Sequence, residues 1–281
     1  MGERRRSIEK FRTEHPFCCF CGGDSPTQTR DHVPPKAAFF GKVWPEGFEF
    51  PACSICNART RFEDQYFSWH LRVFGWSPDD AEKDQVNTDR LSEGLRNNQP
   101  QLLPIAPAKL DELAWLTKHR LLGLEYRGVQ IKRECLNALE ATYRKIAAAL
   151  FYKHVGRPAP ATSAFGAKIK LNLMLEDVST LIRIMNIARF AGDPKRGPED
   201  FRGQFIYTHD YNVEQGLFAI AAKFGGAIVG VAACAERPDE LTIEEVFPLF
   251  RLDGSLLREE KRRDPRPNPH HSPPHPAPAG A

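Results

Sequence analysis

The chain has 281 residues, of which 41% are hydrophobic, so it can bury a sizeable core in one large domain or two modest ones. Its formal net charge at pH 7 is only +3, which argues against a general polyanion binder, so any nucleic-acid contact must come from local basic clusters. No apolar run approaches the roughly 18 residues of a membrane helix, and the N-terminus lacks the apolar core of a secretion signal. We therefore expect an intracellular, cytoplasmic protein that has no membrane partner.

The first fifteen residues are rich in arginine and lysine, and Ile8 and Phe11 stand three residues apart. This spacing is compatible with a short basic amphipathic helix, and the composition is equally compatible with a frayed, solvated terminus. Pro16 ends the segment.

Four of the seven cysteines form two CxxC pairs, which are Cys18 with Cys21 and Cys53 with Cys56. Two residues between the cysteines let both thiolates of a pair reach one metal ion from a tight turn, and Gly22 and Gly23 ease that turn. The two pairs predict a closed, structural four-cysteine zinc site. A redox dithiol and an iron–sulfur cluster are the alternatives.

The remaining three cysteines carry no such pattern. Cys19 lies between two ligands and is expected to point away from the metal. Cys135 and Cys234 stand in helical and strand-like apolar contexts, where we expect inert core residues.

The segment between the CxxC pairs contains residues suited to phosphodiester hydrolysis. That reaction needs a base to activate water and a cation to neutralise the charge that develops on the phosphate. Asp31 suits the cation and His32 suits the water. Because they are adjacent in an extended segment, the two side chains should point to opposite sides, and Pro34 and Pro35 should stiffen the loop that follows.

The residues from Asn57 to His70 predict one helix with two different faces. Asn57, Arg61 and Asp64 share a polar face, and Phe62, Tyr66 and Trp69 share an apolar one. The polar face would look back at Asp31, with Asn57 as a second metal ligand, Arg61 as a phosphate clamp and Asp64 as a distal ligand or an ordinary solvated carboxylate. His70 is expected to be structural.

The motif order CxxC, DHxPPK, CxxCN, then an acidic residue and YF, resembles the HNH nuclease family in its zinc-bearing ββα-metal form, and within it a group of bacterial proteins with this DHxPPK variant. The resemblance covers Cys18 to Trp69. It implies that Asp31 and Asn57 bind the catalytic metal, that His32 is the general base, and that nucleic acid is cut or nicked. Two positions depart from the family pattern: its middle Asn would fall near Phe48, and its final His is Asn57 here.

Beyond Trp69 the sequence predicts fold more than function. Helical spacing in residues 108–154, interrupted near Gly128, predicts two helices, and residues 171–191 predict another. Alternation then predicts strands at 205–207, 216–223 and 227–234, the last two joined as a hairpin. His209, Asp210 and Tyr211 between strands are best explained as a turn.

These patterns predict an α+β protein in four parts. They are a zinc-stabilised ββα-metal module at 1–75, a linker with at most one short helix at 76–107, an α+β domain of unknown role at 108–257 with a helical segment and a small antiparallel sheet, and a disordered basic Pro/His-rich tail at 258–281. The α+β domain can choose a target, bind a protein partner or form an oligomer.

The expected function is a metal-dependent HNH-type endonuclease, a hydrolase of phosphodiester bonds acting on nucleic acid, with DNA as the first expectation over RNA. Zn²⁺ would be structural and Mg²⁺ or Mn²⁺ catalytic, while Arg30, Lys36 and Arg61 would hold flanking phosphates. The alternative is a zinc-scaffolded module that binds nucleic acid or a partner without cutting.

Overall fold

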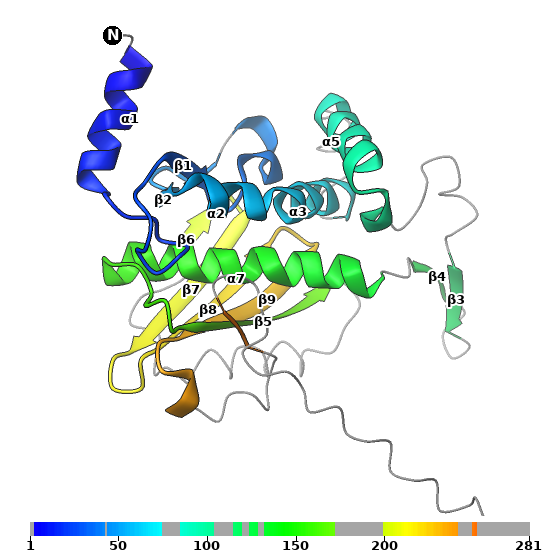
Figure 1. The fold of residues 1–281 in the computed structure, drawn as a ribbon. Helices are drawn as coiled ribbons and strands as arrows, with labels where there is room; N and C mark the ends of the chain where they lie inside the picture. The colour runs from blue at the N-terminus through cyan, green and yellow to red at the C-terminus, as the bar shows by residue number, and fades with distance from the viewer. Residues whose placement is uncertain are drawn as a thin grey trace, which may run out of the picture.

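The computed structural model describes residues 3–42, 44–74, 85–103, 115–119, 124–128, 132–171, 199–240 and 249–251. Helix α7 (Arg133–Val155) is the central element of this part of the chain. An antiparallel sheet packs along one side of α7, and the N-terminal elements pack along the other (Figure 1). The fold is therefore of the mixed α+β class that the sequence predicts.

A two-stranded antiparallel hairpin and the helices after it form the N-terminal part. Its elements are α1 (Glu3–Glu14), β1 (Thr29–His32), the 3₁₀ turns η1 (Lys36–Ala38) and η2 (Phe40–Lys42), β2 (Glu49–Ala52), α2 (Ser54–Arg59) and α3 (Arg61–Phe74). In the hairpin, Asp31 lies opposite Phe50 and His32 lies opposite Glu49. Of the two alternatives for the N-terminus, the structure has the helix.

The single helix predicted from Asn57 to His70 is two helices. The α2 helix begins at Ser54, with Cys53 as its N-cap, and Thr60 separates it from α3. The α3 helix then continues four residues past His70, to Phe74. The predicted apolar face is confirmed at Tyr66 and Trp69, which are buried, whereas Phe62 is only half-buried.

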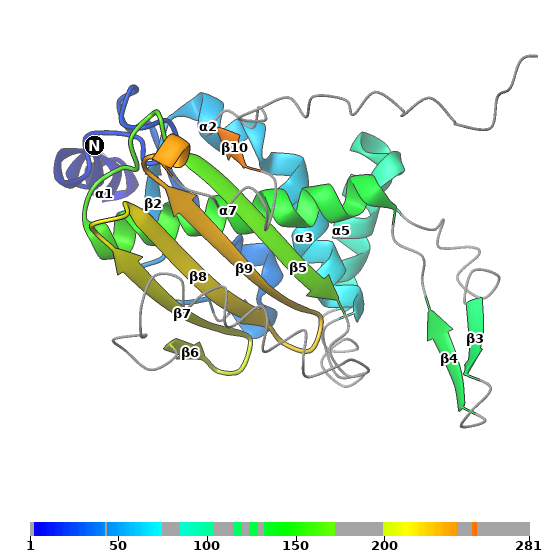
Figure 2. The same ribbon diagram turned by 90° about the horizontal axis from the view of Figure 1, so that it is seen from below.

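The six-stranded sheet has the strand order β10-β5-β9-β8-β7-β6, and every neighbouring pair is antiparallel (Figure 2). Its strands are β5 (Ala164–Leu171), β6 (Glu199–Phe201), β7 (Phe205–Asn212), β8 (Leu217–Phe224), β9 (Ile228–Ala235) and β10 (Phe250–Arg251). The three predicted strands and the β8–β9 hairpin are confirmed. Strand β5 was not predicted, and it pairs with β9 along its whole length.

The prediction of a turn at His209, Asp210 and Tyr211 is wrong, because all three residues lie within β7. The eight residues of β7 pair continuously with β8, and Asp210 lies opposite Ala219. Long pairing with a neighbouring strand satisfies the backbone groups, so the polar side chains of the segment do not break the strand. The chain turns later, between Asn212 and Leu217.

The prediction of the first of two helices in residues 108–154 is also wrong over the part of this segment that the structure describes. Strands β3 (Trp115–His119) and β4 (Leu124–Gly128) form a separate antiparallel hairpin there. Trp115 and Tyr126 are residue types that favour strands, and a partner strand so close in sequence offers local pairing that helical leucine spacing does not reveal. The second predicted helix is α7, which ends at Gly156 with a left-handed φ of 82°.

The segment predicted as a linker contains a larger helix than expected. Helix α5 (Gln85–Asn98) packs against α3, and the 3₁₀ turn η3 (Pro100–Leu102) follows it. A further 3₁₀ turn, η7 (Pro238–Glu240), lies after β9. The helix predicted at 171–191 and the tail predicted at 258–281 lie outside the described residues, apart from Leu171 at the end of β5.

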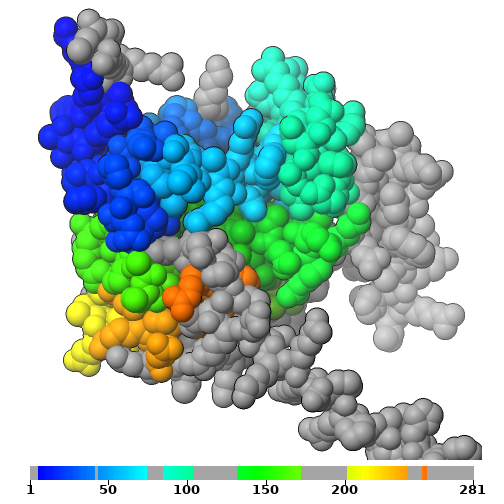
Figure 3. Space-filling view, in the orientation of Figure 1, coloured from blue at the N-terminus to red at the C-terminus, as the bar shows by residue number. Residues whose placement is uncertain are grey.

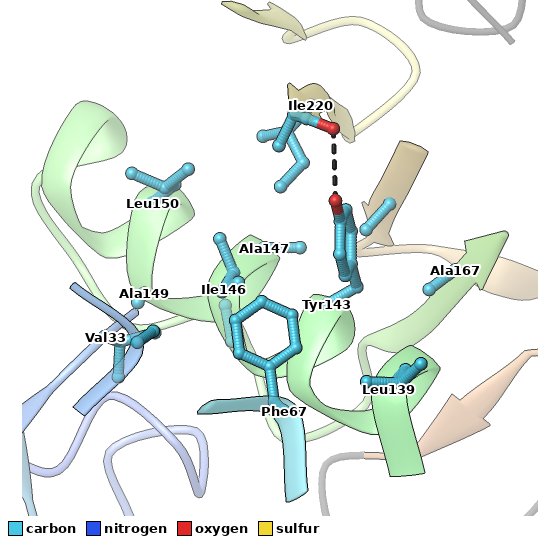
Figure 4. Close-up of a cluster of buried hydrophobic side chains, with 14 of the residues drawn as sticks. Val33, Phe67, Leu139, Tyr143, Ile146, Ala147, Ala149, Leu150, Ala167 and Ile220 are labelled. Atoms are coloured by element: carbon cyan, nitrogen blue, oxygen red, sulfur yellow. Dashed lines mark hydrogen bonds between the residues drawn. The ribbon is translucent and has the colours of Figure 1, made fainter. Parts of the chain in front are cut away.

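Helix α7 has buried residues on most of its circumference because it is covered from two sides (Figure 4). Toward α3 and the sheet, the rings of Phe67 and Phe224 meet edge to face at 4.9 Å, and the Tyr143 hydroxyl donates a hydrogen bond to the Ala222 carbonyl at 3.1 Å. A Cβ at Gly230 would lie 2.8 Å from both the Tyr143 ring and the Lys168 carbonyl, so only glycine lets α7 come this close to β9.

The apolar core is continuous from the cysteines of the N-terminal part through α7 to the sheet. The predicted division of the chain into a nuclease module and a second domain remains a prediction. Among the described residues, no helix has both the length and the apolar character needed to cross a bilayer.

The α3 residue His70 is 1% exposed, and neither of its ring nitrogens has a hydrogen-bond partner within the described part of the chain. Its ring contacts those of Tyr66 and Phe74. Burial lowers the pKa of His70 from 6.5 to about 3. The folded protein therefore holds this imidazole neutral, whereas the unfolded chain can protonate it below pH 6.5.

This difference predicts an acid sensitivity that one substitution removes. Because the folded pKa is depressed, the stabilisation is present above pH 6.5 and is lost as the pH falls below that value. We expect the free energy of unfolding to fall by about 2 kcal/mol more in the parent than in His70→Phe between pH 7 and pH 5, measured by urea unfolding. Val73→Ala, at an exposed position of the same helix, should keep the parental pH dependence. Equal slopes for the parent and His70→Phe would contradict the assignment.

Candidate functional site

The four predicted cysteine ligands converge on one point. The Sγ atoms of Cys18, Cys21, Cys53 and Cys56 all lie within 4.8 Å of one another, so the cluster can hold a metal ion such as zinc. The loop that carries the first pair turns through Gly22 and Gly23, whose φ angles are 73° and 85°. The second pair sits at the start of α2.

Backbone amides and a neighbouring thiol stabilise negative charge on the sulfur atoms of the cluster. The amide of Phe20 donates to Cys18 Sγ at 3.3 Å, and the amide of Cys56 donates to Cys53 Sγ at 3.4 Å. Hydrogen bonding with Cys56 lowers the pKa of the Cys18 thiol to about 5, which favours the thiolate that metals bind. Cys19 is not part of the cluster, as expected; it is fully buried, and burial raises its pKa well above the usual value.

His32 and Asp31 face opposite sides of β1, as predicted. Asp31 is 7% exposed and faces the core, whereas the His32 side chain is 26% exposed. His32 Nε2 lies 2.9 Å from Glu49 Oε1 on the facing strand, and the Arg30 guanidinium donates to the other oxygen of Glu49 at 3.2 Å. Burial lowers the pKa of His32, and the effect of Glu49 opposes this only in part. The His32 imidazole is therefore mostly neutral at pH 7.

Asp31 forms an ion pair that the sequence did not reveal. Lys145 Nζ, on α7, lies 2.8 Å from Asp31 Oδ2 and 2.5 Å from Asp64 Oδ2. The Lys145 side chain is only 4% exposed. Burial by itself would lower the pKa of Lys145, but the charges of Asp64 and Asp31 outweigh it and raise the pKa. One buried ammonium thus balances two carboxylates, from β1 and α3.

Asp64 carries the excess negative charge of this group. Burial raises the pKa of Asp64 to about 6, against the opposing effect of Lys145. Its Oδ1 atom has no hydrogen-bond partner among the described residues, while Oδ2 accepts from the Thr60 hydroxyl at 3.2 Å. Asp64 is thus a half-buried carboxylate whose charge the fold only partly satisfies.

A second group of predicted site residues, Asn57, Arg61 and Asp64, lies in an open pocket. Thr29, Ser54 and Ala58 complete the lining of this pocket, whose volume is about 360 Å³. The Asn57 amide donates to Thr29 Oγ1 at 3.0 Å. The predicted polar face is therefore brought together, but Asp31 pairs with Lys145 and Asn57 pairs with Thr29.

The ion pairs of Lys145 decide whether Asp31 and Asp64 can bind the predicted catalytic metal. Carboxylate oxygens such as those of Asp31 and Asp64 are the donors that Mg²⁺ prefers. Both carboxylates already contact the Lys145 ammonium, so a divalent ion would have to displace it. As arranged, these residues fit an ammonium rather than a divalent cation, and in the described part of the chain the four cysteines form the one cluster of Cys, His, Asp or Glu compact enough to hold a metal.

Phe48, where the family pattern has its middle Asn, anchors the hairpin in a different way. It is 2% exposed, and its ring meets those of Phe201 and Phe205 at 5.1 and 6.0 Å. The Gln204 side chain accepts a hydrogen bond from the Phe40 amide at 2.9 Å. Apolar packing and this bond therefore fix the loop between β1 and β2 to the sheet.

Sequence reasoning missed Lys145 and Glu49. Lys145 directly precedes an apolar run on α7 that begins with Ile146 and Ala147, and a lysine at the edge of such a run is a signal for a buried ion pair. Its partners stand 114 and 81 residues away, so no local pattern identifies them. Glu49 becomes a candidate only once the register of β1 against β2 is known.

The cysteine cluster predicts one zinc per chain in the purified protein. Cys56→Ser should lose most of this zinc and lower the thermal midpoint, because a structural metal contributes directly to folding free energy. Cys135→Ser is the matched control, since Cys135 is buried on α7 and contacts the Leu102 carbonyl, away from the cluster. Metal analysis and thermal unfolding measure both effects. A chain that holds iron, or that forms a reversible disulfide in place of metal, would overturn the zinc assignment.

A substitution of Lys145 tests whether its ammonium takes the place of a metal ion between Asp31 and Asp64. Lys145→Met leaves two buried carboxylates without a counter-ion and should reduce stability by about 3–5 kcal/mol. If the position is a cation site, millimolar Mn²⁺ should raise the thermal midpoint of Lys145→Met but leave that of the parent unchanged. Lys153→Met, at an exposed position of α7, is the control and should be insensitive to Mn²⁺. A parent that responds to Mn²⁺ as strongly as Lys145→Met would show that the ammonium does not compete with metal.

Comparison with known proteins adds no relative to this geometry: no family model matches the chain, and no curated protein or solved structure matches it either.

Proposed function

We propose that this chain is an HNH-type endonuclease that hydrolyses phosphodiester bonds of nucleic acid, with DNA as the first substrate to test. The observation that carries the proposal is the pairing of half-exposed His32 with Glu49 across a hairpin that the four-cysteine cluster flanks. A base held by a second group is the arrangement that water activation needs. The order of two antiparallel strands followed by a helix supports the HNH resemblance.

His32 would act as the general base. When Nε2–H donates to the Glu49 carboxylate, Nδ1 is left as the proton acceptor, and Glu49 stabilises the imidazolium that forms after proton transfer. The lowered pKa of His32 keeps the base neutral at pH 7. Glu49 is a positioning residue in this scheme, because it acts through His32.

The surroundings of His32 supply groups that can hold a polynucleotide. The Lys36 ammonium lies 3.7 Å from the centre of the Trp44 ring, which is itself edge-on to His32. A groove of about 830 Å³ opens beside Glu49, and its aromatic lining consists of Phe11, His15, Trp44, Phe50 and Tyr152. Its charged lining consists of Lys153 and three glutamates, Glu14, Glu46 and Glu49, so a polynucleotide would bind there mainly through its bases. Aromatic rings next to cations are the usual platform for unstacked bases. Of the predicted phosphate contacts, Lys36 is therefore beside this groove, Arg30 is bonded to Glu49, and Arg61 is exposed on α3.

The metal requirement of the reaction belongs to the same proposal. A bound Mg²⁺ or Mn²⁺ would neutralise the charge that develops on the scissile phosphate. Asp31 and Asn57 are its predicted ligands, with Asp64 as a possible further one, and such an ion would have to displace Lys145 from the two carboxylates.

That ion pair favours a second candidate, a zinc-scaffolded module that binds nucleic acid without cutting it. A lysine in place of a metal removes the Lewis acid and leaves the phosphate-binding side chains intact. The two candidates differ in one observable, the cleavage of a phosphodiester bond.

A plasmid-nicking assay with Mg²⁺ or Mn²⁺ separates them. We expect the parent to nick, and His32→Ala to nick about 10²–10⁴-fold more slowly, the usual contribution of a general base. Glu93→Gln, at an exposed position of α5, should keep parental activity. Equal nicking by the parent and His32→Ala would remove His32 as the base. A parent that binds DNA and zinc but cuts with neither metal would establish the second candidate.

Glu49→Gln tests the positioning role through its pH profile. The rate should rise with pH through the pKa of His32 and level off by pH 7, because that pKa lies below its usual value of 6.5. Since Glu49 raises the pKa of His32, its removal should move the midpoint to lower pH as well as reduce the rate. A reduced rate with an unmoved midpoint would indicate that Glu49 acts on the fold of the hairpin alone.

A further inference from the structure

Strand β1 presents Arg30 and His32 on the same side of the hairpin. They stand two residues apart in an extended segment, and Asp31 between them faces the core. On β2, Glu49 lies directly opposite His32. Because Arg30 lies opposite Pro51 in the same register, Glu49 is also the diagonal neighbour of Arg30. One carboxylate therefore stands between a guanidinium and an imidazole.

Both oxygens of the Glu49 carboxylate are bonded, each to a different partner. Arg30 Nη1 donates to Oε2 at 3.2 Å, and His32 Nε2 lies 2.9 Å from Oε1. The Glu49 side chain is 33% exposed, so packing alone does not fix its orientation. The terminal torsion of a glutamate is soft, and a carboxylate bonded through one oxygen can turn about it. The bond from Arg30 therefore fixes the plane in which Glu49 faces His32.

The other sides of the Arg30 guanidinium contact helix α1, which stands beside the hairpin in Figure 1. Nη2 donates to the carbonyl oxygen of Ser7 and, at 2.8 Å, to the Ser7 hydroxyl. The guanidinium lies 4.7 Å from the centre of the Phe11 ring. Its Nε atom is buried and has no hydrogen-bond partner among the described residues. Arg30 therefore joins α1 to Glu49.

This occupancy bears on the expected contact of Arg30 with a flanking phosphate. A guanidinium holds phosphate best through two neighbouring N–H donors at once. Two of the three nitrogens of Arg30 already donate within the protein, and the third is buried. Arg30 thus has no open pair of donors for a phosphate.

We propose that Arg30 is a positioning residue, which links α1 to Glu49 and holds the Glu49 carboxylate in the orientation that receives the Nε2–H of His32. This inference rests on the proposed nuclease function, in which His32 is the general base. In a neutral imidazole, the hydrogen bond made by one nitrogen determines which nitrogen carries the proton. Arg30 acts through Glu49 and does not touch the substrate.

Nicking by the full-length, zinc-loaded protein tests this role by separating kcat from KM. We expect Arg30→Met to lower kcat about 10–100-fold, the usual effect of removing an orienting partner, with KM unchanged. The slope of log affinity for DNA against log salt should also stay at the parental value, whereas loss of a phosphate contact would reduce it by about 0.9. Arg96→Met, at an exposed position of α5, is the matched control and should equal the parent.

Two further comparisons separate positioning from a general effect on the fold. Arg30→Lys keeps the charge, but one ammonium cannot replace a fork that reaches Glu49 and Ser7 together, so its kcat should lie between those of the parent and Arg30→Met. Arg30→Met combined with Glu49→Gln should be no slower than Glu49→Gln alone, because both changes remove the same hold on His32. Zinc content and thermal midpoint confirm that each variant is folded.

The tautomer of His32 provides a readout that does not depend on cutting. Two-bond ¹H–¹⁵N correlation spectra, recorded at one fixed pH at which the imidazole is neutral, show which ring nitrogen carries the proton. His32→Ala identifies the signals. We expect the Nε2–H form to dominate in the parent and in Arg96→Met, and a mixture of the two forms in Arg30→Met and in Glu49→Gln.

The outcomes distinguish this proposal from the nuclease proposal. A parent that does not nick, together with a changed His32 tautomer in Arg30→Met, would remove the nuclease function and leave the hold of Arg30 on the Glu49–His32 pair in place. The parental tautomer in Arg30→Met would overturn the positioning role. A raised KM with a reduced salt slope in Arg30→Met would also overturn it and would make Arg30 a phosphate contact.

Discussion

The ion group of Lys145 with Asp31 and Asp64 is the interaction on which the arrangement of this protein depends. A buried ammonium is costly unless carboxylates surround it, so α7, β1 and α3 must stay together to satisfy all three charges. Because Lys145 lies on the helix that also packs against the sheet, the same contact fixes the hairpin to the whole body. It also determines the chemistry available at Asp31, since a metal and an ammonium compete for the same oxygens.

Two further attachments hold the hairpin in place. The cysteine cluster joins the loop before β1 to the start of α2, and Phe48 inserts its ring among the aromatic residues of β6 and β7. Between these two anchors, His32 and Glu49 stay at the surface at hydrogen-bonding distance. The hairpin thus presents one buried acid and one accessible base, a division that follows directly from the alternation of side chains along a strand.

Basic side chains stand at three separate places around this body. Lys36 lies over the Trp44 ring near His32, Arg61 lines the open pocket with Asn57, and Arg59, Arg144 and Arg251 line a further pocket next to α2 and α7 (Figure 3 shows the α2 and α7 side of the molecule). Each of these places has its own acidic neighbour, in keeping with a net charge of only +3. Glu49, Asp64 and Glu63 respectively limit how strongly each place attracts an anion.

The sequence by itself determined the features that depend on neighbours in the chain. The two CxxC spacings identified the cluster, period-two alternation separated Asp31 from His32, and the glycines between β8 and β9 identified their hairpin. The tertiary structure alone decided the partners. Helix packing brings Lys145 to Asp31, and strand register brings Glu49 to His32. Strand pairing formed β3 and β4 where a helix was expected, and it continued β7 through an expected turn. The physical reason is that backbone pairing and charge compensation are satisfied between segments far apart in sequence, where local propensity carries no information.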